Sequence, residues 1–353
     1  MLPVRILVVD DSVVVRKFLC EALAGSSQVE VVGTASNGAI ALAKIPQMNP
    51  DVITLDIEMP GLDGIQTLTE IRKLHPKLPV IMFSTLTERG AAITLEALSR
   101  GASDYMTKPS NSESLANAIE QVRSQLIAKV VSLTGGSRIG KAPPQPRAVR
   151  RKSSTQRVSI LTIGTSTGGP NALAEVVPRL PEDFPVPVVV VQHMPPLFTR
   201  LLAERLNSQS PLSVNEAEAN RTLKAGQVWI ARGDYHLTVV RRGAEAVLNL
   251  SQDPPEHSCR PAVDVLFRSV AQVYGAGALG VVMTGMGSDG ARGAAHIRDA
   301  GGEILVQDEA SSVVWGMPGA VVNAGAADKV CPLAEMSTEI IRRVKASKLE
   351  LSV

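Results

Sequence analysis

The chain has 353 residues, of which 44% are hydrophobic, 20% are charged and 3% are aromatic. This length suits two domains, each with its own core, and the hydrophobic share excludes a largely disordered protein. A net charge of +2 gives no support for binding to nucleic acid. Since no run approaches the ~18 apolar residues of a membrane span, we expect a cytoplasmic protein that is not inserted in a membrane.

The first part of the chain alternates short apolar segments with helical patterns. We predict strands at residues 5–10, 30–35, 51–56, 79–84 and 104–108, with helices between them and a last helix within 112–126. This alternation is typical of an α/β domain with a doubly wound, five-stranded parallel sheet, which we place at residues 1–124.

A segment rich in Gly, Pro and Ser interrupts the pattern. Residues 135–157 contain seven Lys or Arg and no acidic residue. We therefore predict the end of a connecting helix and a flexible basic linker over residues 125–157, because this composition is typical of a solvated tether. A patch for nucleic acid or for an acidic partner is the alternative.

A second α/β pattern defines a domain at residues 158–346. Apolar strands are predicted at residues 159–164, 187–193, 278–285 and 302–308, with a β-rich stretch over 226–250. The fold class predicted for this domain is a mainly parallel α/β sheet with some antiparallel strands.

Polar residues of the first domain stand where its strands end. Because parallel strands end at one edge of a sheet, these side chains are expected to meet there. Three carboxylates repel one another unless a divalent cation lies among them, and oxygen ligands suit Mg²⁺. Asp10, Asp11 and Asp56 are the predicted metal ligands, and Asp56, before a Pro- and Gly-rich loop, is the predicted phosphorylation site. Lys108 and Ser84 are placed to contact the phosphoryl oxygens. The alternative is that the aspartates are helix caps and loop residues.

The motifs VVDDS and LDIEMPGLDG, with Tyr105 three residues before Lys108, make this domain resemble the receiver domain of two-component response regulators. The resemblance implies that a histidine kinase donates a phosphoryl group to Asp56, and that Ser84 and Tyr105 form a switch. It also implies a Mg²⁺ site made by Asp11, Asp56 and a main-chain carbonyl near Glu58, with Asp10 assisting.

In the second domain, Ser166 lies on a glycine-rich turn, GTSTGGP, between a strand and a helix. Such a turn exposes a serine hydroxyl and can supply oxyanion donors, but it also fits a loop that binds phosphate. His193 ends the next apolar strand and is the candidate general base. Asp289, in a glycine-dense loop after a third strand, is the candidate acid that orients the imidazole. Asp264 is the main competitor for that role, although it fits a surface or capping residue of an amphipathic helix.

The remaining histidines and the cysteines are assigned no part in the chemistry. The histidines fit structural or peripheral positions, and the cysteines have no metal-binding spacing. These residues are His75, His236, His257, His296, Cys20, Cys259 and Cys331.

The order serine, histidine, acid differs from that of α/β-hydrolases, so the G-x-S-x-G pattern does not assign the domain to that family. The segments IGTSTGGP, VVVQHMP, HSCRPAVDVLF and VVMTGMGSDGARG instead resemble the catalytic domain of bacterial chemotaxis receptor methylesterases. The resemblance implies that Ser166, His193 and Asp289 hydrolyse glutamate γ-methyl esters and deamidate glutamines on methyl-accepting chemoreceptors, with no cofactor for the esterase. We expect a monomer whose unphosphorylated receiver domain obstructs Ser166. The alternatives are a domain that binds a ligand without catalysis and, with less support, a DNA-binding output domain.

Overall fold

The computed structural model describes residues 2–108, 115–135 and 157–349. The chain divides into two compact units, Met1–Gly140 and Lys141–Val353. Most of the predicted basic linker, at residues 136–156, lies outside the described residues. None of the helices in the described ranges is long and apolar enough to cross a membrane.

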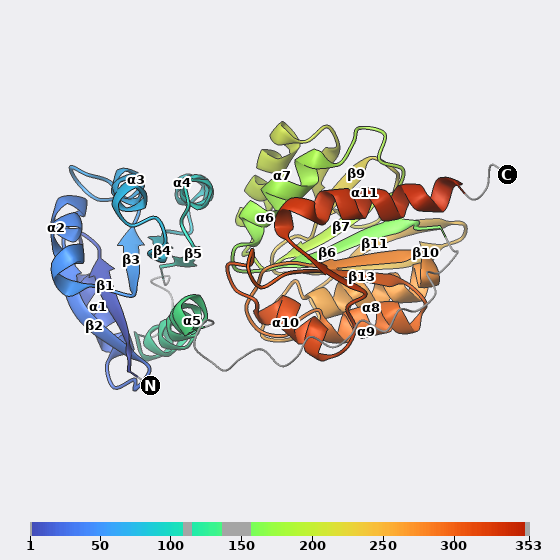
Figure 1. Ribbon diagram of the computed structural model, residues 1–353. Helices are drawn as coiled ribbons and strands as arrows, with labels where there is room; N and C mark the ends of the chain where they lie inside the picture. The colour runs from blue at the N-terminus through green and yellow to red at the C-terminus, as the bar shows by residue number, and fades with distance from the viewer. Residues whose placement is uncertain (1, 109–114, 136–156, 350–353) are drawn as a thin grey trace. The chain divides into compact units, whose positions relative to one another are not determined.

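The first unit is a parallel sheet with helices on both faces (Figure 1). Its strands are β1 (Val4–Val9), β2 (Val29–Ala35), β3 (Val52–Asp56), β4 (Val80–Ser84) and β5 (Asp104–Thr107). Its helices are α1 (Val13–Leu23), α2 (Gly38–Met48), α3 (Gly64–Leu74), α4 (Glu88–Ser99) and α5 (Leu115–Gly135). The strand order β2-β1-β3-β4-β5 confirms the predicted doubly wound, five-stranded sheet.

Local sequence explains where these elements begin and end. The strands are nearly continuous apolar runs because helices cover both faces of the sheet, and β3 is buried at each of its positions. Asp63 forms a capping box with Gln66 at the start of α3, and the side chain of Ser12 caps α1. Helix α5 continues past the predicted segment to Gly135.

The second unit contains a larger parallel sheet. Its strands, in chain order, are β6 (Ile160–Thr165), β7 (Val188–Gln192), β8 (Ser213–Glu216), β9 (Gln227–Ile230), β12 (Ala278–Val282), β13 (Glu303–Gln307) and β14 (Lys329–Cys331). They lie in the order β14-β13-β12-β6-β7-β9-β8, and every pair is parallel. The short strands β8 and β14 were not predicted.

Helices cover both faces of this sheet. They are α6 (Gly169–Val176), α7 (Phe198–Gln209), α8 (Val263–Tyr274), α9 (Ala291–Asp299), α10 (Gly316–Asn323) and α11 (Leu333–Leu349), with short 3₁₀ turns η1 (Val177–Arg179) and η2 (Gly275–Gly277). Figure 1 shows α6, α7 and α11 on one face and α8, α9 and α10 on the other.

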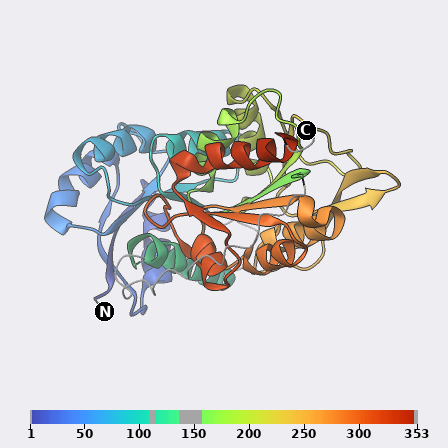
Figure 2. The ribbon, with the colours of Figure 1, turned by 45° about the vertical axis from the view of Figure 1, so that its right-hand side comes forward.

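The antiparallel strands form a separate ribbon. It consists of β10 (His236–Arg242) and β11 (Glu245–Ser251), and Figure 2 shows it, in yellow, apart from the main sheet. A mainly parallel α/β sheet with some antiparallel strands is thereby confirmed as the fold of this unit. The central strands β12, β6 and β7 are buried throughout, so their carboxyl ends form a rigid edge on which side chains can be held.

Candidate active site

Ser166 lies on the turn between β6 and α6. The strand ends at Thr165 and the helix begins at Gly169, which leaves a tight connection between them. Gly168 closes it with a φ of +78°, a conformation that glycine adopts without steric cost. Within residues 160–170, Ser166 alone is partly exposed, and all the others are buried. The turn therefore presents the serine to solvent on an otherwise rigid support.

The backbone of this turn is already engaged. The N–H of Ser166 donates to the carbonyl of Thr284 over 3.0 Å, and the N–H of Gly169 donates to the carbonyl of Ser166 over 2.8 Å. Neither group is free to bind a developing oxyanion. That other N–H groups of the turn serve as oxyanion donors stays a prediction.

His193 and Asp289 meet at the same edge of the sheet. His193 directly follows β7, and Asp289 lies in the loop between β12 and α9. The distance from His193 Nε2 to Asp289 Oδ2 is 2.8 Å. Because β6 lies between β7 and β12, the histidine and the aspartate meet next to the turn that carries Ser166.

The serine and the histidine come from paired strands. The N–H of His193 donates to the carbonyl of Thr165 over 3.2 Å, so His193 lies beside the residue that precedes Ser166. In the described part of the chain, Ser166 Oγ makes no hydrogen bond to His193. The contact between nucleophile and base therefore stays a prediction.

Burial and hydrogen bonding act against each other on the two titrating groups. Burial lowers the pKa of His193, but the hydrogen bond to Asp289 and the contact with Cys259 outweigh it and raise the pKa to about 9. Burial raises the pKa of Asp289, but the hydrogen bond and charge of His193 and backbone N–H groups hold it below its ordinary value. The pair therefore favours imidazolium and carboxylate.

Gln192 ties the serine turn to the histidine strand. Its buried Nε2 donates to the carbonyls of Ser166, over 3.0 Å, and His193, over 3.2 Å. Its Oε1 accepts from the hydroxyl of Thr165. A Cβ on Gly169 would lie 2.0 Å from Gln192 Oε1, so this clamp requires glycine at the start of α6.

The first unit gathers its carboxylates as predicted from the strand ends. Oxygen atoms of Asp10, Asp11 and Asp56 lie within 4.8 Å of one another. Asp10 Oδ2 is buried and accepts no hydrogen bond, although it lies 3.0 Å from Lys108 Nζ. An all-oxygen donor set with one orphaned buried oxygen fits a hard divalent cation.

Lys108 partly balances these charges. Its Nζ lies 2.9 Å from Asp56 Oδ1. Burial raises the pKa of Asp56 to about 6, with Lys108 opposing the rise and Asp10 adding to it. Asp56 is thus a buried carboxylate whose charge needs a cation beside it.

The two residues of the implied switch occupy different settings. Ser84 is buried at the end of β4, with Oγ 3.2 Å from the carbonyls of both Thr85 and Gly90. Tyr105 lies on β5 with Lys129 Nζ 5.9 Å from the centre of its ring, and burial raises its pKa well above the ordinary value. The switch role of both residues stays a prediction.

Two protein-family models match the chain. The CheB methylesterase model matches residues 161–340, and the response regulator receiver domain model matches residues 6–120. The chain is 53% identical to the protein-glutamate methylesterase/protein-glutamine glutaminase of Trichodesmium erythraeum, over 96% of this chain and 99% of that protein. The chain belongs to the CheB methylesterase family.

Further comparisons agree with this membership in the CheB methylesterase family. A protein of the same name from Nocardioides sp. is 50% identical over 99% of this chain and 97% of its own. The crystal structure of the Thermotoga maritima CheB methylesterase catalytic domain covers 52% of this chain and 97% of its own, with 42% identity and a TM-score of 0.52. The chain is therefore an ester hydrolase of this family that carries a receiver domain.

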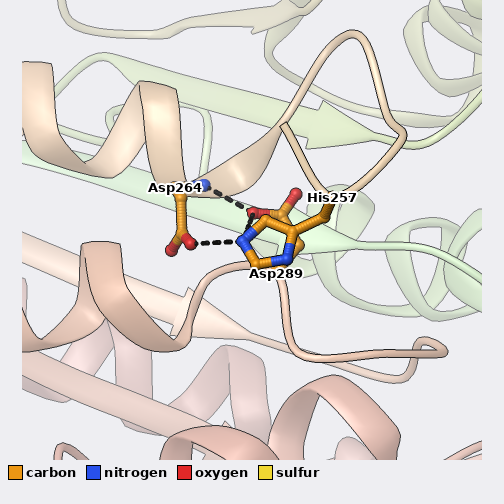
Figure 3. A group of neighbouring side chains, drawn as sticks. All are labelled: His257, Asp264 and Asp289. Carbon is orange, nitrogen blue, oxygen red and sulfur yellow. Dashed lines mark hydrogen bonds and ion pairs between the residues drawn. The ribbon is translucent and has the colours of Figure 1, made fainter. Parts of the chain in front are cut away.

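The methylesterase site also contains residues to which the sequence analysis gave other roles or none. For Asp264 we had expected a surface or capping position; it is completely buried, which excludes the surface, and it accepts a hydrogen bond from the N–H of Gly293 in α9, which agrees with capping. It pairs with His257, whose Nε2 lies 2.8 Å from Asp264 Oδ2 (Figure 3). Cys259 Sγ lies 3.6 Å from His193 Nδ1, although no cysteine was assigned to the site. His236, the first residue of β10, is also buried, which agrees with a structural position.

The segment HSCRPAVDVLF, on which the family resemblance partly rests, indicated some of these residues. It contains His257, Cys259 and Asp264 within eight positions. A reading that placed the whole segment near Asp289 would have found them.

Proposed function

We propose that the chain is a serine hydrolase that removes methyl groups from glutamate γ-methyl esters on chemoreceptors, and that it deamidates glutamines by the same steps. The observation that carries this proposal is the hydrogen bond between His193 and the buried Asp289 beside the partly exposed Ser166. The name that these relatives share, protein-glutamate methylesterase/protein-glutamine glutaminase, indicates the substrate class: a glutamate ester or a glutamine of a protein.

The chemistry runs in two halves. Ser166 Oγ attacks the ester carbonyl while His193 takes its proton, and collapse of the tetrahedral intermediate releases methanol with a proton returned by His193. Water then attacks the acyl-enzyme with the same help, which restores Ser166 and leaves a glutamate. Asp289 binds Nε2 of His193, so the serine would use Nδ1, which Cys259 Sγ approaches to 3.6 Å and would have to yield.

A glutamine substrate follows the same path and releases ammonia. The amine is a poorer leaving group than methanol, so this reaction depends more on proton donation by His193. The raised pKa of His193, about 9, favours the protonated imidazole that this step uses.

The receiver domain is proposed to regulate this activity. A histidine kinase would phosphorylate Asp56, with Mg²⁺ held by Asp11 and Asp56 and with Asp10 assisting. The metal would shield the charge on the phosphoryl group. Lys108 would neutralise the phosphoryl oxygens, and Ser84 and Tyr105 would respond as the switch. The oxygen cluster and its orphaned buried atom support this assignment.

The unphosphorylated receiver domain is proposed to restrain the esterase, and phosphorylation would release it by adding negative charge at Asp56. The full chain should then be less active than residues 158–353 alone, and a small-molecule phosphodonor with Mg²⁺ should raise its activity. Equal activities before phosphorylation would rule out restraint by the receiver domain.

Release of methanol from methylated receptor tests the catalytic assignment. Ser166→Ala should lower kcat by at least about 10³-fold, and Ser208→Ala, at an exposed serine of α7, should not change it. A serine-directed acylating reagent should label Ser166 in the wild type and not in His193→Ala. Labelling that does not depend on His193, together with full activity of Ser166→Ala, would favour a ligand-binding loop.

A further inference from the structure

A strained turn carries His257 into the site. His257 and Ser258 have φ values of +53° and +58°, and the N–H and carbonyl groups of Glu256 and Cys259 bond reciprocally across them. This is the pattern of a type I′ turn, which normally uses Asn or Gly. At residue types other than Asn or Gly, a left-handed backbone costs roughly 1–2 kcal/mol per residue, so His257 and Ser258 are both strained. Such strain often marks a functional site.

Two helices exchange carboxylate caps next to this turn. Asp289 lies just before α9 but accepts hydrogen bonds from the first N–H groups of α8, Val263 at 2.6 Å and Asp264 at 2.8 Å. Asp264 lies in the first turn of α8 but accepts from Gly293 of α9, at 2.6 Å. Each carboxylate therefore stabilises the start of the other helix.

The exchange places two buried carboxylates close together, and His257 stands between them. Its Nε2 lies 2.8 Å from Asp264 Oδ2 and 4.0 Å from Asp289 Oδ1 (Figure 3). Asp264 and Asp289 are 0% and 2% exposed, whereas the His257 side chain is 26% exposed. The ring of His257 therefore binds Asp264 and also faces Asp289.

We propose that the His257–Asp264 pair is a positioning pair for the hydrolase site, which holds the Asp289 carboxylate and sets the pH range in which His193 can act as base. This inference rests on the proposed function, and it gives His257 and Asp264 a positioning role in that site.

The other charged groups near the pair are already matched. Glu256 pairs with Arg268, whose positive charge also interacts with both carboxylates. His193 pairs with Asp289 and faces Cys259. His236 binds the carbonyl of Pro254. In the described ranges, His257 is therefore the side chain that hydrogen-bonds the Asp264 carboxylate.

A divalent metal ion fits the same three residue types, but the carboxylate oxygens are already used. Asp264 binds His257 and Gly293, and Asp289 binds His193 and the start of α8. An ion pair with exchanged helix caps accounts for all these atoms.

The sign of the electrostatic effect follows from charge alone. Removing the negative charge of Asp264 makes the surroundings of His193 less negative, which disfavours imidazolium and lowers the pH at which His193 becomes a base. Removing the ring of His257 leaves both carboxylates in place but takes away the side chain that binds Asp264, so it should act on the position of Asp289 and hence on kcat.

The test uses the full chain and two conservative variants. Asn tolerates the left-handed backbone of His257, and Asn at position 264 can still accept the bond from Gly293. Asp264→Asn should lower the pKa of His193 by about one unit, measured by NMR titration of the imidazole, and the rise of kcat/KM with pH should move with it. His257→Asn should lower kcat with KM nearly unchanged.

Controls separate charge from structure. Ser258→Gly relieves strain in the same turn without touching the pair, and Asp299→Asn makes the same chemical change at an exposed residue of α9. Neither should move the pKa of His193 or lower kcat. An unchanged pKa of His193 in Asp264→Asn, or an unchanged kcat in His257→Asn, would overturn the proposal, and if one variant does not fold the other still tests the pair.

The failure of this inference can be told from failure of the proposed function. Full activity of Ser166→Ala would refute the serine mechanism, but the NMR titration of His193 would still decide whether Asp264 controls its charge.

Discussion

Cys259 Sγ lies 3.6 Å from Nδ1 of His193, on the opposite side of the ring from the nitrogen that Asp289 binds. The thiol thus occupies the side of the imidazole that the nucleophile needs. It is also one of the partners that raise the pKa of His193 to about 9. A general base must be unprotonated, so kcat/KM for ester hydrolysis should rise with pH until about 9.

Replacing Cys259 should shift the pH range over which kcat/KM rises. In Cys259→Ala, one of the partners that favour imidazolium is lost, so the rise should occur at lower pH and kcat/KM at neutral pH should be higher. A pH profile of methanol release measures the shift, with Cys20→Ala, in the other domain, as the control. An unchanged profile would mean that Cys259 does not contribute to the pKa of His193.

The clamp made by Gln192 predicts a loss of rate with little loss of binding. Gln192→Glu removes the donor that joins the carbonyls of Ser166 and His193 and places a carboxyl group against them. Misplacing a nucleophile and its base should lower kcat by roughly 10–100-fold, with KM nearly unchanged. Steady-state kinetics beside Gln209→Glu, at an exposed position of α7, provides the comparison. A change in KM alone would contradict a positioning role.

Gly169 should not tolerate a side chain. A Cβ there would lie 1.7 Å from Thr165 Oγ1 and 2.0 Å from Gln192 Oε1, so Gly169→Ala has to displace the clamp or the turn. We expect a loss of activity at least as large as that of the Gln192 variant. Gly226→Ala is an informative control, because it tests left-handed backbone at a site with open space around the added carbon.

Asp56 should be the residue that accepts phosphate. Asp56→Asn should abolish incorporation from a small-molecule phosphodonor in the presence of Mg²⁺, and Asp51→Asn, at an exposed position just before β3, should leave it intact. Incorporation is measured by intact-protein mass spectrometry under non-acidic conditions. Labelled Asp56→Asn protein would place the phosphorylation site elsewhere.

Asp289 should affect stability as well as rate. It is buried and accepts bonds from His193, from the first two N–H groups of α8 and from Gly290. Asp289→Ala leaves these donors unpaired and should destabilise the domain by about 2–4 kcal/mol, whereas Ser166→Ala should change stability by less than about 0.5 kcal/mol. Calorimetry of the full chain measures both, and equal unfolding temperatures would contradict the capping role.

The sequence predicted those parts of the site that stand at strand ends. Asp10, Asp56, His193 and Asp289 follow buried apolar runs, and parallel strands bring such ends to one edge. His257 could not be placed in this way. It lies in a type I′ turn, which normally uses Asn-Gly, and the dipeptide His257-Ser258 does not predict such a turn.

Asp264 was misread for a different reason. Its place in an amphipathic helix correctly predicted α8, but its burial comes from α9, whose Gly293 approaches the start of α8 closely. A helical pattern in one segment carries no information on which distant helix will cover its first turn.

The order of the central strands limits how this enzyme can be re-engineered. β6 lies between β7 and β12, so His193 and Asp289 reach each other beside the turn that carries Ser166. Residues added to that turn would push the two partners apart. The tip of the β10–β11 ribbon is exposed, and a side chain at Gly243 would meet open space. A reporter or an affinity tag inserted at this tip should therefore leave the esterase active.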